Sequence, residues 1–570
     1  MDAKPWLTHY DEGVPPSLAP YPHKPLFAFL EEAAARFPER ACTVFQGRVI
    51  TYREMNDLTD RMAAGLASVG VLKGDRVGIF IPNTPQFVIA FYGILKAGGV
   101  AVATNPLYSP REIEHQLKDS AIECMVVMSN NYQRIKDVQP KVPSLKRLVV
   151  TNVKEQLPPI KALLFGLLKE KPGGHRVELA EGDVWMKDLL ARFSAAQRPK
   201  LDLGGDDMAL LQYSGGTTGL SKGAIATHGG LVANSAQIRA WLHTAREGQE
   251  VTLMAIPLFH VYGMIAGMSL GIQVGSTLVM VPDPRNLKDL LENINRYHPT
   301  LFPGVPTLYN AINNHPDVKA GKYDLSSIRV CISGSAPLLL ETKHTFERLT
   351  GGHLFEGYGL SEAPTATHCN PLTGLNKEGS IGMPLPDVEC RIVSLEDGTT
   401  LVPKGEIGEL LVRGPQVFKG YWNMPTETAN TLNPDPDGGG PWLSTGDIVR
   451  MDEDGYFYIV DRKKELIKAG GFQVWPREIE EVLAAHPKVL EVGVAGIPDA
   501  YRGETVKAWL VLRPDQEATE AEIKAWCADK LAMFKVPTQI EFRSELPKTT
   551  VGKVLRRELV REHKEKDGLK

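Results

Sequence analysis

Glycine, hydroxyl and lysine residues gather in one short stretch of the chain. Residues 213–228 read YSGGTTGLSKGAIATH, and the positions suited to gripping phosphate are Ser214, Gly215, Gly216, Thr217, Thr218, Gly219 and Lys222. Glycines let a backbone approach an anion with its N–H groups turned inward, hydroxyls add donors, and lysine adds a mobile positive charge. The composition therefore predicts a phosphate-binding loop, with an ordinary surface loop as the alternative.

This stretch is not a Walker A loop. That pattern requires glycine directly before the lysine and serine or threonine directly after it. Here Ser221 precedes Lys222 and Gly223 follows it. The spacing disfavours a P-loop NTPase, so a different nucleotide chemistry has to be sought further along the chain.

Three later segments carry carboxylates and a lysine suited to a nucleotide. Residues 356–362 read EGYGLSE, and one oxygen ligand such as Glu362 is the usual protein share of a magnesium held otherwise by water and phosphate. Asp447, in the segment STGD, fits either a ribose-binding carboxylate or the cap of a turn. Lys553 follows a glycine, which predicts an exposed lysine on a mobile loop or, alternatively, part of a basic surface.

Two predicted strands end in loops of small residues. Residues 300–308 (TLFPGVPTL) and 329–337 (RVCISGSAP) each run from an apolar segment into a turn that contains glycine. Open α/β sheets bind ligands at such strand ends. His260 lies in the apolar segment PLFHVYG, where a lone histidine is more often a core residue than a catalyst.

The elements that must position these segments alternate between strand and helix. The predicted strands are residues 75–82, 99–104, 123–129 and 147–151, and the predicted helices are residues 26–36, 52–69 and 85–97. Thr51 and Glu54 have the spacing of a capping box at the start of the second helix. The alternation predicts an α/β fold with a mostly parallel sheet flanked by helices.

Length and composition narrow the class of protein. A chain of 570 residues exceeds what one hydrophobic core usually supports, which predicts at least two domains. A net charge of -4 gives no reason to expect nucleic-acid binding. The six cysteines lie far apart without a CxxC pair, which argues against a zinc site or a disulfide framework. The N-terminal residues lack the pattern of a signal peptide, so we expect a cytoplasmic protein.

Two apolar stretches bear on contact with a membrane. Residues 261–281 are uncharged over a length that could cross a bilayer, but they contain four glycines and Gln273, so we interpret them as a buried helix followed by a buried strand. Residues 157–171 (LPPIKALLFGLLKEK) are too short to cross and are flanked by lysines. They fit either a helix on the inner face of the cell membrane or a helix packed on its own domain, and the pattern does not separate the two.

Five segments in this order resemble the adenylate-forming (ANL) superfamily of acyl-CoA synthetases, luciferases and nonribosomal peptide adenylation domains. They are SGGTTGLSKG, EGYGLSE, STGD, VDRKKELIKAGGFQVWP and PKTTVGKVLRREL. The resemblance extends from Leu26 to Leu559, and residues 103–120 and 412–422 look most like the bacterial long-chain fatty acid:CoA ligases.

That resemblance implies a two-domain enzyme with two half-reactions. A large N-terminal domain of several subdomains, residues 1–461, with parallel-rich sheets flanked by helices, would be joined at a hinge near Asp461 to a small mobile α+β lid, residues 462–570. The fatty carboxylate would attack the α-phosphate of ATP and release pyrophosphate, and CoA would then displace AMP from the acyl-adenylate. The implied partners are ATP with Mg²⁺, CoA and a fatty acid, and a homodimer is left open.

The resemblance also assigns roles to individual residues. Lys553 would bridge the carboxylate and the α-phosphate, Glu362 would bind Mg²⁺, and His260 would lie beside the carboxylate and the pantetheine tunnel. The positions implied at ATP or AMP are the phosphate-loop residues named above together with Gly334, Ser335, Ala336, Glu356, Gly357, Tyr358, Gly359, Ser361, Asp447 and Arg462. The CoA tunnel would include Lys468, Gly470 and Gly471, and the acyl pocket would include Val261, Gly304 and Val305.

Other functions share part of this pattern. An amino-acid adenylation domain would normally carry an aspartate after the phenylalanine that here precedes His260, and that aspartate is absent. A coumarate- or benzoate-like aryl acid:CoA ligase has the same motifs and differs only in its acid pocket. A non-catalytic acyl-nucleotide sensor is the alternative from another class, and the intact set of Lys222, Glu362, Asp447 and Lys553 argues against it.

Overall fold

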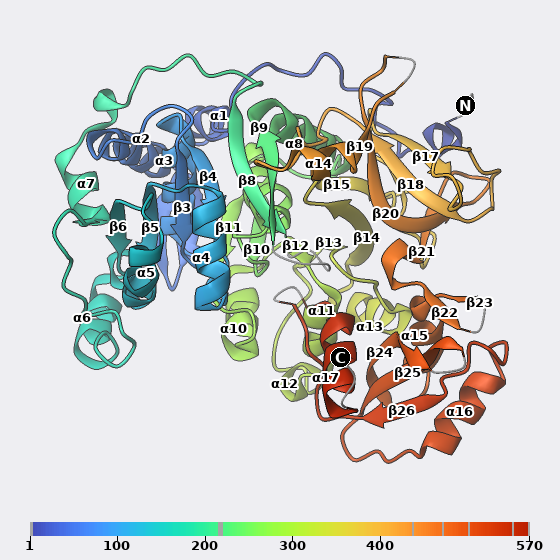
Figure 1. The fold of residues 1–570 in the computed structure, drawn as a ribbon. Coiled ribbons are helices and arrows are strands. Elements are labelled where there is room, and N and C mark those ends of the chain that lie inside the picture. The colour runs from blue at the N-terminus through green and yellow to red at the C-terminus, as the bar shows by residue number, and fades with distance from the viewer. Residues whose placement is uncertain are drawn as a thin grey trace.

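Two large, mostly parallel sheets form the body of the molecule (Figure 1). The computed structural model describes residues 4–214, 221–435, 438–469, 472–499, 502–549 and 552–567. The seven-stranded sheet has the order β7 (Val184–Trp185), β6 (Arg147–Thr151), β5 (Cys124–Met128), β3 (Arg76–Phe80), β4 (Val100–Ala103), β8 (Met208–Ser214) and β9 (Lys222–Thr227). The nine-stranded sheet has the order β16 (Met383–Pro384), β15 (Ala363–Cys369), β14 (His353–Leu360), β13 (Val330–Ser333), β12 (Leu301–Gly304), β10 (Val251–Met254), β11 (Thr277–Met280), β1 (Ala41–Phe45) and β2 (Arg48–Thr51).

Two smaller sheets complete the chain. One consists of β17 (Glu389–Val393), β18 (Gly408–Arg413), β20 (Trp442–Met451) and β19 (Leu432–Asn433), with β21 (Phe457–Arg462) paired to β20. The other follows it in the sequence and consists of β23 (Phe472–Val474), β22 (Ile467–Ala469), β25 (Gly503–Leu512) and β24 (Val489–Asp499), with β26 (Gln539–Phe542) paired to β25. This last sheet has a hydrophobic core of its own and forms the lower body in Figure 1.

Helices connect and cover the sheets. They are α1 (Ala28–Arg36), α2 (Tyr52–Ser68), α3 (Pro85–Lys96), α4 (Pro110–Asp119), α5 (Tyr132–Val138), α6 (Pro159–Leu168), α7 (Met186–Arg192), α8 (His228–Trp241), α9 (Leu270–Gln273), α10 (Leu287–Tyr297), α11 (Pro306–Asn314), α12 (Pro316–Lys319), α13 (Leu340–Thr350), α14 (Pro425–Ala429), α15 (Pro476–Ala484), α16 (Glu520–Ala528) and α17 (Arg556–Lys566). The predicted alternation of strands and helices is confirmed, because β3, β4, β5 and β6 fall within the predicted strand ranges and pair in parallel. The capping box at Thr51 and Glu54 is also formed.

Helix α3 joins the two large sheets into one core. It contacts β3 and β4 of the seven-stranded sheet and β1 of the nine-stranded sheet, and each of its residues is buried. Its last residue is a lysine, and a buried ammonium is costly unless it is fully hydrogen-bonded. The Nζ of Lys96 therefore donates to Asn56 Oδ1 at 2.8 Å, Thr59 Oγ1 at 2.9 Å and Asp60 Oδ1 at 2.8 Å.

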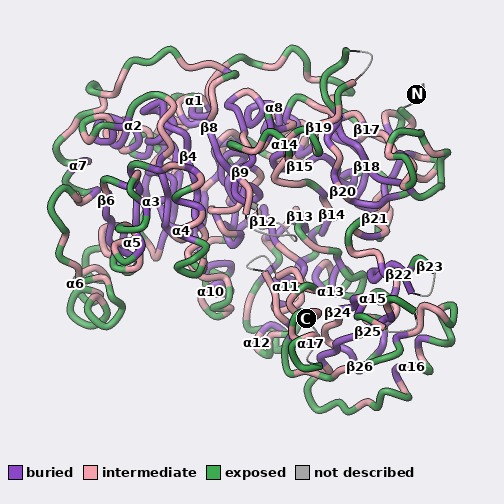
Figure 2. Tube along the Cα trace, viewed as in Figure 1, coloured by how far each residue is buried: buried purple, intermediate pink, exposed green. Residues whose placement is uncertain are grey.

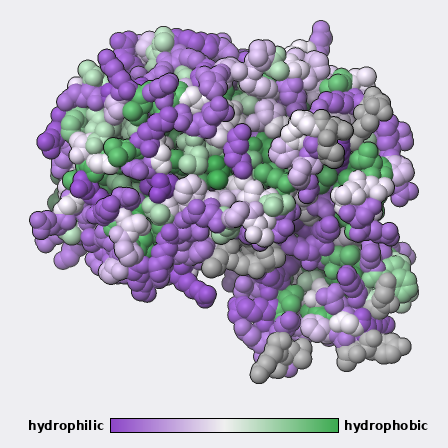
Figure 3. All heavy atoms as spheres, turned by 45° about the horizontal axis from the view of Figure 1, so that its top comes forward, coloured by the Kyte–Doolittle hydropathy of each residue, from purple (hydrophilic) through white to green (hydrophobic). Residues whose placement is uncertain are grey.

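The apolar stretch at 261–281 is buried, as predicted. It forms the π-helix η6 (Tyr262–Ser269), the short helix α9 and strand β11. No helix among the described residues has both the length and the apolar character needed to cross a bilayer. All six cysteines are buried and unpaired. On the face drawn in Figure 3, hydrophobic side chains form small patches between hydrophilic ones.

Candidate active site

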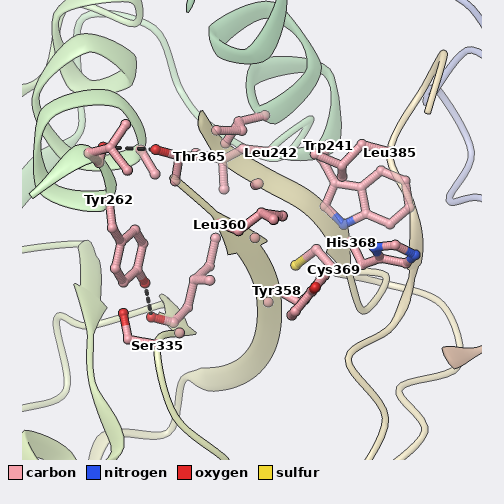
Figure 4. Close-up of a pocket in the computed structure, with 18 of the residues that line it drawn as sticks. Trp241, Leu242, Tyr262, Ser335, Tyr358, Leu360, Thr365, His368, Cys369 and Leu385 are labelled. Carbon is pink, nitrogen blue, oxygen red and sulfur yellow. Dashed lines mark hydrogen bonds between the residues drawn. The ribbon is translucent and has the colours of Figure 1, made fainter. Parts of the chain in front are cut away.

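A cavity lies beside the ends of β13 and β14, against η6 and α8. Together with the part that opens to solvent, its space is about 700 Å³. The lining combines small residues and one polar end with a long apolar wall (Figure 4). The lining residues are Ile238, Trp241, Leu242, His260, Val261, Tyr262, Ala266, Ile332, Gly334, Ser335, Gly357, Tyr358, Gly359, Leu360, Thr365, Ala366, His368, Cys369, Leu372 and Leu385.

The polar end is formed by loops that follow the strands. The Tyr262 hydroxyl donates to the carbonyl of Ile332 at 2.6 Å, which fixes η6 against β13. Ser335 has a φ of +72°, so the small-residue loop after β13 turns sharply next to Gly334. Gly359 must be glycine, because a Cβ built there would lie 1.6 Å from the carbonyl oxygen of Thr365.

The opposite wall of the cavity is apolar. Helix α8 contributes Ile238 and Trp241, and Leu242 follows directly after it; Figure 4 shows Trp241 and Leu385 at the far side from Tyr262. The Trp241 indole N–H donates to the carbonyl of Asn370 at 3.0 Å, so its polar atom is satisfied and its ring is left to form the wall. Such a wall suits a hydrocarbon or aromatic group.

His260 lies on the cavity lining and is held in its neutral form. Its Nδ1 accepts a hydrogen bond from the backbone N–H of Tyr262 at 3.2 Å. Burial lowers the pKa of His260 to about 4, because the protonated ring would lose its hydration. With Nδ1 accepting, the remaining proton is on Nε2, so the ring can donate one hydrogen bond to an anion in the cavity.

Asp447 is the centre of a charged cluster next to the cavity. The antiparallel pairing of β20 and β21 places it directly opposite Arg462, and Arg462 Nε lies 2.5 Å from Asp447 Oδ1. The Tyr358 hydroxyl donates to Asp447 Oδ2 at 2.6 Å. The Asp447 carboxylate in turn raises the pKa of the Arg462 guanidinium. A buried carboxylate held by two partners is suited to accept hydrogen bonds from hydroxyls.

Lys553 reaches this cluster from the C-terminal part of the chain. Gly552 touches Thr307 on α11, where an added Cβ would lie 2.2 Å from the Thr307 hydroxyl oxygen. Burial and the positive charge of Arg462 lower the pKa of Lys553, while the carboxylates of Glu465 and Asp447 oppose that shift. The lysine therefore lies within electrostatic reach of Asp447, as expected for a residue that neutralises a phosphate there.

A second pair of charges lies where the segment 420–422 runs beside β9. Ile225 donates its N–H to the carbonyl of Gly420 at 3.0 Å, and Tyr421 forms a bridge with Ala224. The Tyr421 hydroxyl donates to Glu362 Oε1 at 2.7 Å. The Lys222 ammonium lies 5.2 Å from the centre of the Tyr421 ring and forms an ion pair with Glu427 on α14. Tyr421 thus links the predicted phosphate lysine to the predicted magnesium ligand.

The donor set at Glu362 fits a magnesium ion bound mainly by nucleotide phosphate and water. Glu362 offers one carboxylate, and its Oε1 accepts a hydrogen bond from the Tyr421 hydroxyl. Among the described residues, no group of three or more histidine, cysteine or acidic side chains is arranged to hold a metal. A single carboxylate is the share that a protein usually gives to magnesium in nucleotide sites.

Some residues predicted from the motifs lie elsewhere or outside the described chain. Glu356 is buried in a separate hollow beside Leu338, where burial raises its pKa to about 7. Val261 lines the cavity, but Gly304 and Val305 are not among its lining residues. The Tyr309 side chain lies against Gly304, where an added Cβ would be 2.5 Å from the Tyr309 hydroxyl oxygen. Gly215, Gly216, Thr217, Thr218, Gly219, Gly470 and Gly471 fall outside the described residues, and only the backbone of Ser214 is described.

The remaining predicted residues lie around the cluster. Ser361 directly precedes Glu362 in the turn between β14 and β15, and Ala336 follows Ser335 in the loop after β13. Lys468 is exposed on β22, and its backbone N–H donates to Glu504. The Asp461 carboxylate accepts hydrogen bonds from the backbone N–H groups of Arg462 and Arg477, both at 2.7 Å, and lies 3.1 Å from an Arg556 nitrogen.

Several lining residues were not predicted from the sequence. Trp241, Leu242, Leu372 and Leu385 are ordinary apolar residues without a motif around them. The helical apolar spacing of residues 228–242 could have identified α8, but not the face that lines a cavity. Glu427 lies 205 residues from Lys222, and no local pattern marks that pairing.

Comparison with known proteins agrees with this geometry. The AMP-binding enzyme family matches residues 30–422, and the AMP-binding enzyme C-terminal domain matches residues 478–553. A long-chain-fatty-acid–CoA ligase of Bacillus subtilis is 44% identical over 100% of this chain and 99% of its own length. A long-chain-fatty-acid–CoA ligase of Yersinia pestis is 38% identical, over 98% of this chain and 97% of its own.

A solved structure shows the same fold over nearly the whole chain. The anthranilate CoA ligase AuaEII in complex with anthranoyl-AMP superposes with a TM-score of 0.82 at 27% identity, covering 96% of this chain and 98% of its own. The match includes both the large sheets and the C-terminal sheet. The chain therefore belongs to the AMP-binding enzymes of the ANL superfamily.

Proposed function

We propose that this protein is an ATP-dependent fatty acid:CoA ligase. It joins a medium- or long-chain fatty acid to AMP with release of pyrophosphate, and then transfers the acyl group to CoA with release of AMP. The observation that carries the proposal is one cavity with a long apolar wall that adjoins the Asp447, Arg462 and Lys553 cluster. The full-length similarity to long-chain-fatty-acid–CoA ligases supports the same substrate class.

The first half-reaction has to bring a carboxylate up to a polyanion. We assign Lys222 to the β- and γ-phosphates and Lys553 to the α-phosphate and the attacking carboxylate, where positive charge stabilises the transition state most. The neutral His260 would orient the carboxylate through Nε2–H. Asp447 would accept the ribose hydroxyls, and its ion pair with Arg462 would hold that carboxylate in position.

Magnesium would be held by Glu362 together with the phosphates of ATP. When bound, it neutralises phosphate charge and polarises the bond to the leaving pyrophosphate. Tyr358, Gly334, Ser335 and the neighbouring small residues would enclose the adenine, since they form the polar end of the cavity.

The second half-reaction needs room for CoA where Lys553 now lies. We place the domain boundary after Asp461, so that residues 462–570 rotate as a lid and carry Lys553 away from the cavity. The same rotation would bring Lys468 and residues 470–471 toward the thiol. Because the Asp461 carboxylate contacts Arg477 and Arg556 of the small domain, it would hold one end of the rotating body.

The variant Lys553→Ala tests whether Lys553 acts in the first half-reaction and not in the second. Losing the ammonium should lower fatty-acid-dependent exchange of pyrophosphate into ATP by about 10²–10³-fold, the usual cost of removing one oriented charge or donor. Transfer of the acyl group from pre-formed acyl-adenylate to CoA should stay close to the wild-type rate. Equal loss of both half-reactions would refute the assignment.

An aryl acid:CoA ligase is the nearest alternative. The fold is shared with the anthranilate CoA ligase, and Tyr262, Tyr358 and Trp241 could enclose an aromatic ring. The full-length similarity to long-chain-fatty-acid–CoA ligases favours an alkyl chain. The acid that gives the highest kcat/KM separates the two functions.

We also propose that α6 binds the inner face of the cell membrane. None of its residues is buried, and Ile160, Leu163, Leu167 and Leu168 are 76%, 65%, 73% and 67% exposed. Figure 2 shows this helix as an exposed projection from the body. The exposure of these side chains supports membrane contact over a helix packed on its own domain. Lys161, Lys169 and Lys171 supply positive charge for anionic headgroups.

Flotation with vesicles that contain anionic lipid tests this role. Wild-type protein should float, and the variant Leu163→Asp with Leu167→Asp should stay at the bottom of the gradient. Leu72→Asp is the matched control, because Leu72 is also an exposed leucine, at 68%, but lies outside α6. Equal flotation of the α6 variant and the wild type would exclude the contact. Light scattering of the same samples would report whether the protein is a homodimer.

A further inference from the structure

An N-terminal arm packs behind the apolar wall of the cavity. The arm consists of residues 5–18, which include the short helix η1 (Pro5–His9) and precede the region matched by the AMP-binding enzyme family, residues 30–422. Figure 1 shows the N-terminus beside β17. Trp6 and Val14 are buried in the same hydrophobic cluster as Ile238, Trp241 and Leu372 of the cavity lining.

Tyr10 supports the wall from outside. Its ring meets the Trp241 ring edge-on, with 5.0 Å between the centres and an angle of 86° between the planes. Its hydroxyl donates to the carbonyl of Pro384 at 2.6 Å, directly before the lining residue Leu385. One arm residue thus holds two lining residues that belong to different elements.

Asp11 holds the loop that carries Leu372. Its buried carboxylate accepts backbone N–H bonds from Leu372 at 2.7 Å, Thr373 at 3.0 Å and Gly374 at 2.6 Å. The side chain of Asp11 is almost fully buried. A buried carboxylate that satisfies three successive N–H groups fixes the loop strongly, because each group would otherwise lose its partner.

We propose that this arm is a specificity-determining part of the acyl pocket. Tyr10 and Asp11 would act as positioning residues that hold Trp241 and Leu372 at the end of the apolar wall and so limit the length of the acyl chain. The inference rests on the proposed function, since it requires an alkyl substrate. Arm residues touch the wall only from behind, so they would alter the choice of acid without altering ATP binding.

The test compares acid profiles of Asp11→Ala and Tyr10→Leu with the wild type. Pyrophosphate release is measured with saturated acids from six to eighteen carbons. Loosening the wall should raise kcat/KM for acids longer than the wild-type optimum, relative to the optimum itself, by at least about threefold, since one methylene is worth about ten-fold or more in a tight apolar pocket. The KM for ATP should stay unchanged. Glu12→Ala is the matched control, because Glu12 is an exposed arm residue next to Asp11.

The outcomes separate this inference from the proposed function. A wild-type protein with no activity on alkyl acids would refute the proposed function. An active wild type with unchanged profiles in both variants, or with a uniform decline on all acids, would overturn the role of the arm. If Asp11→Ala does not fold, Tyr10→Leu and the milder Tyr10→Phe give a graded series, in which Phe keeps the ring against Trp241 and should shift the profile less.

Discussion

Glu427 forms an ion pair with Lys222, the lysine that we propose binds the β- and γ-phosphates of ATP. Its carboxylate would therefore compete with a phosphate for the same ammonium group. Both side chains are partly exposed, and exposed ion pairs are worth about 0.2–1 kcal/mol. Glu427→Gln removes a competitor for the ammonium, so the KM for ATP should fall by about 1.5- to 5-fold, while the KM for the fatty acid stays constant. The exposed Glu406→Gln is the control. A higher KM for ATP in Glu427→Gln would show that the pair orients Lys222 instead.

His368 makes stability depend on pH. Burial lowers its pKa from 6.5 to about 3, so below pH 6.5 the unfolded chain binds a proton that the folded chain does not, and stability falls as the pH falls. Between pH 7 and pH 5 the wild type should lose about 2 kcal/mol relative to His368→Gln. Unfolding in urea at both pH values measures this difference. A constant difference between the two proteins would contradict the buried, neutral state of His368.

At the scale of elements, α3 depends on the hydrogen bonds of its buried lysine. Asp60→Ala removes the nearer of the two carboxylates at the Lys96 ammonium, leaving only Glu31 at 3.9 Å, and should cost about 3–5 kcal/mol. Lys96→Met should cost less, because Asp60 keeps its contact with Arg198 at 3.0 Å and the methionine remains apolar in the core. Denaturant unfolding of the two variants gives the comparison, and equal losses would mean that the charge pairing does not matter here.

Elements and site residues differed in how far the sequence could predict them. Strands β3 to β6 and helix α2 have strong periodicity and caps, so local pattern was sufficient. The residues that we propose for nucleotide binding could be assigned from the sequence because glycine, hydroxyl and charged residues stand together in motifs, and the structure brings three of them, Tyr358, Asp447 and Arg462, into contact. The apolar wall could not be assigned in this way, because Leu372 and Trp241 come together only through tertiary packing. Gly304 is not a lining residue of this cavity, and the Tyr309 side chain lies against it, a contact that local pattern does not reveal.

For the whole molecule, the proposed mechanism uses one cavity in two half-reactions. The charges of Arg462 and Asp447 both influence the pKa of Lys553, and we propose that this arrangement forms the adenylate. Gly552 contacts Thr307 in this arrangement. Replacing Gly552 with valine should therefore impair adenylation more than acyl transfer to CoA, because the Cβ would clash with α11 only in this state. Equal impairment would argue against a moving lid.

We propose that the apolar cavity accepts a fatty acid for ligation to CoA. The most direct measurement is release of pyrophosphate and AMP by the purified protein with ATP and magnesium, across saturated acids from acetate to eighteen carbons plus benzoate and cinnamate, with and without CoA. We expect CoA-dependent AMP release that is highest with medium- or long-chain alkyl acids. A maximum with benzoate or cinnamate, or no release with any acid, would contradict it.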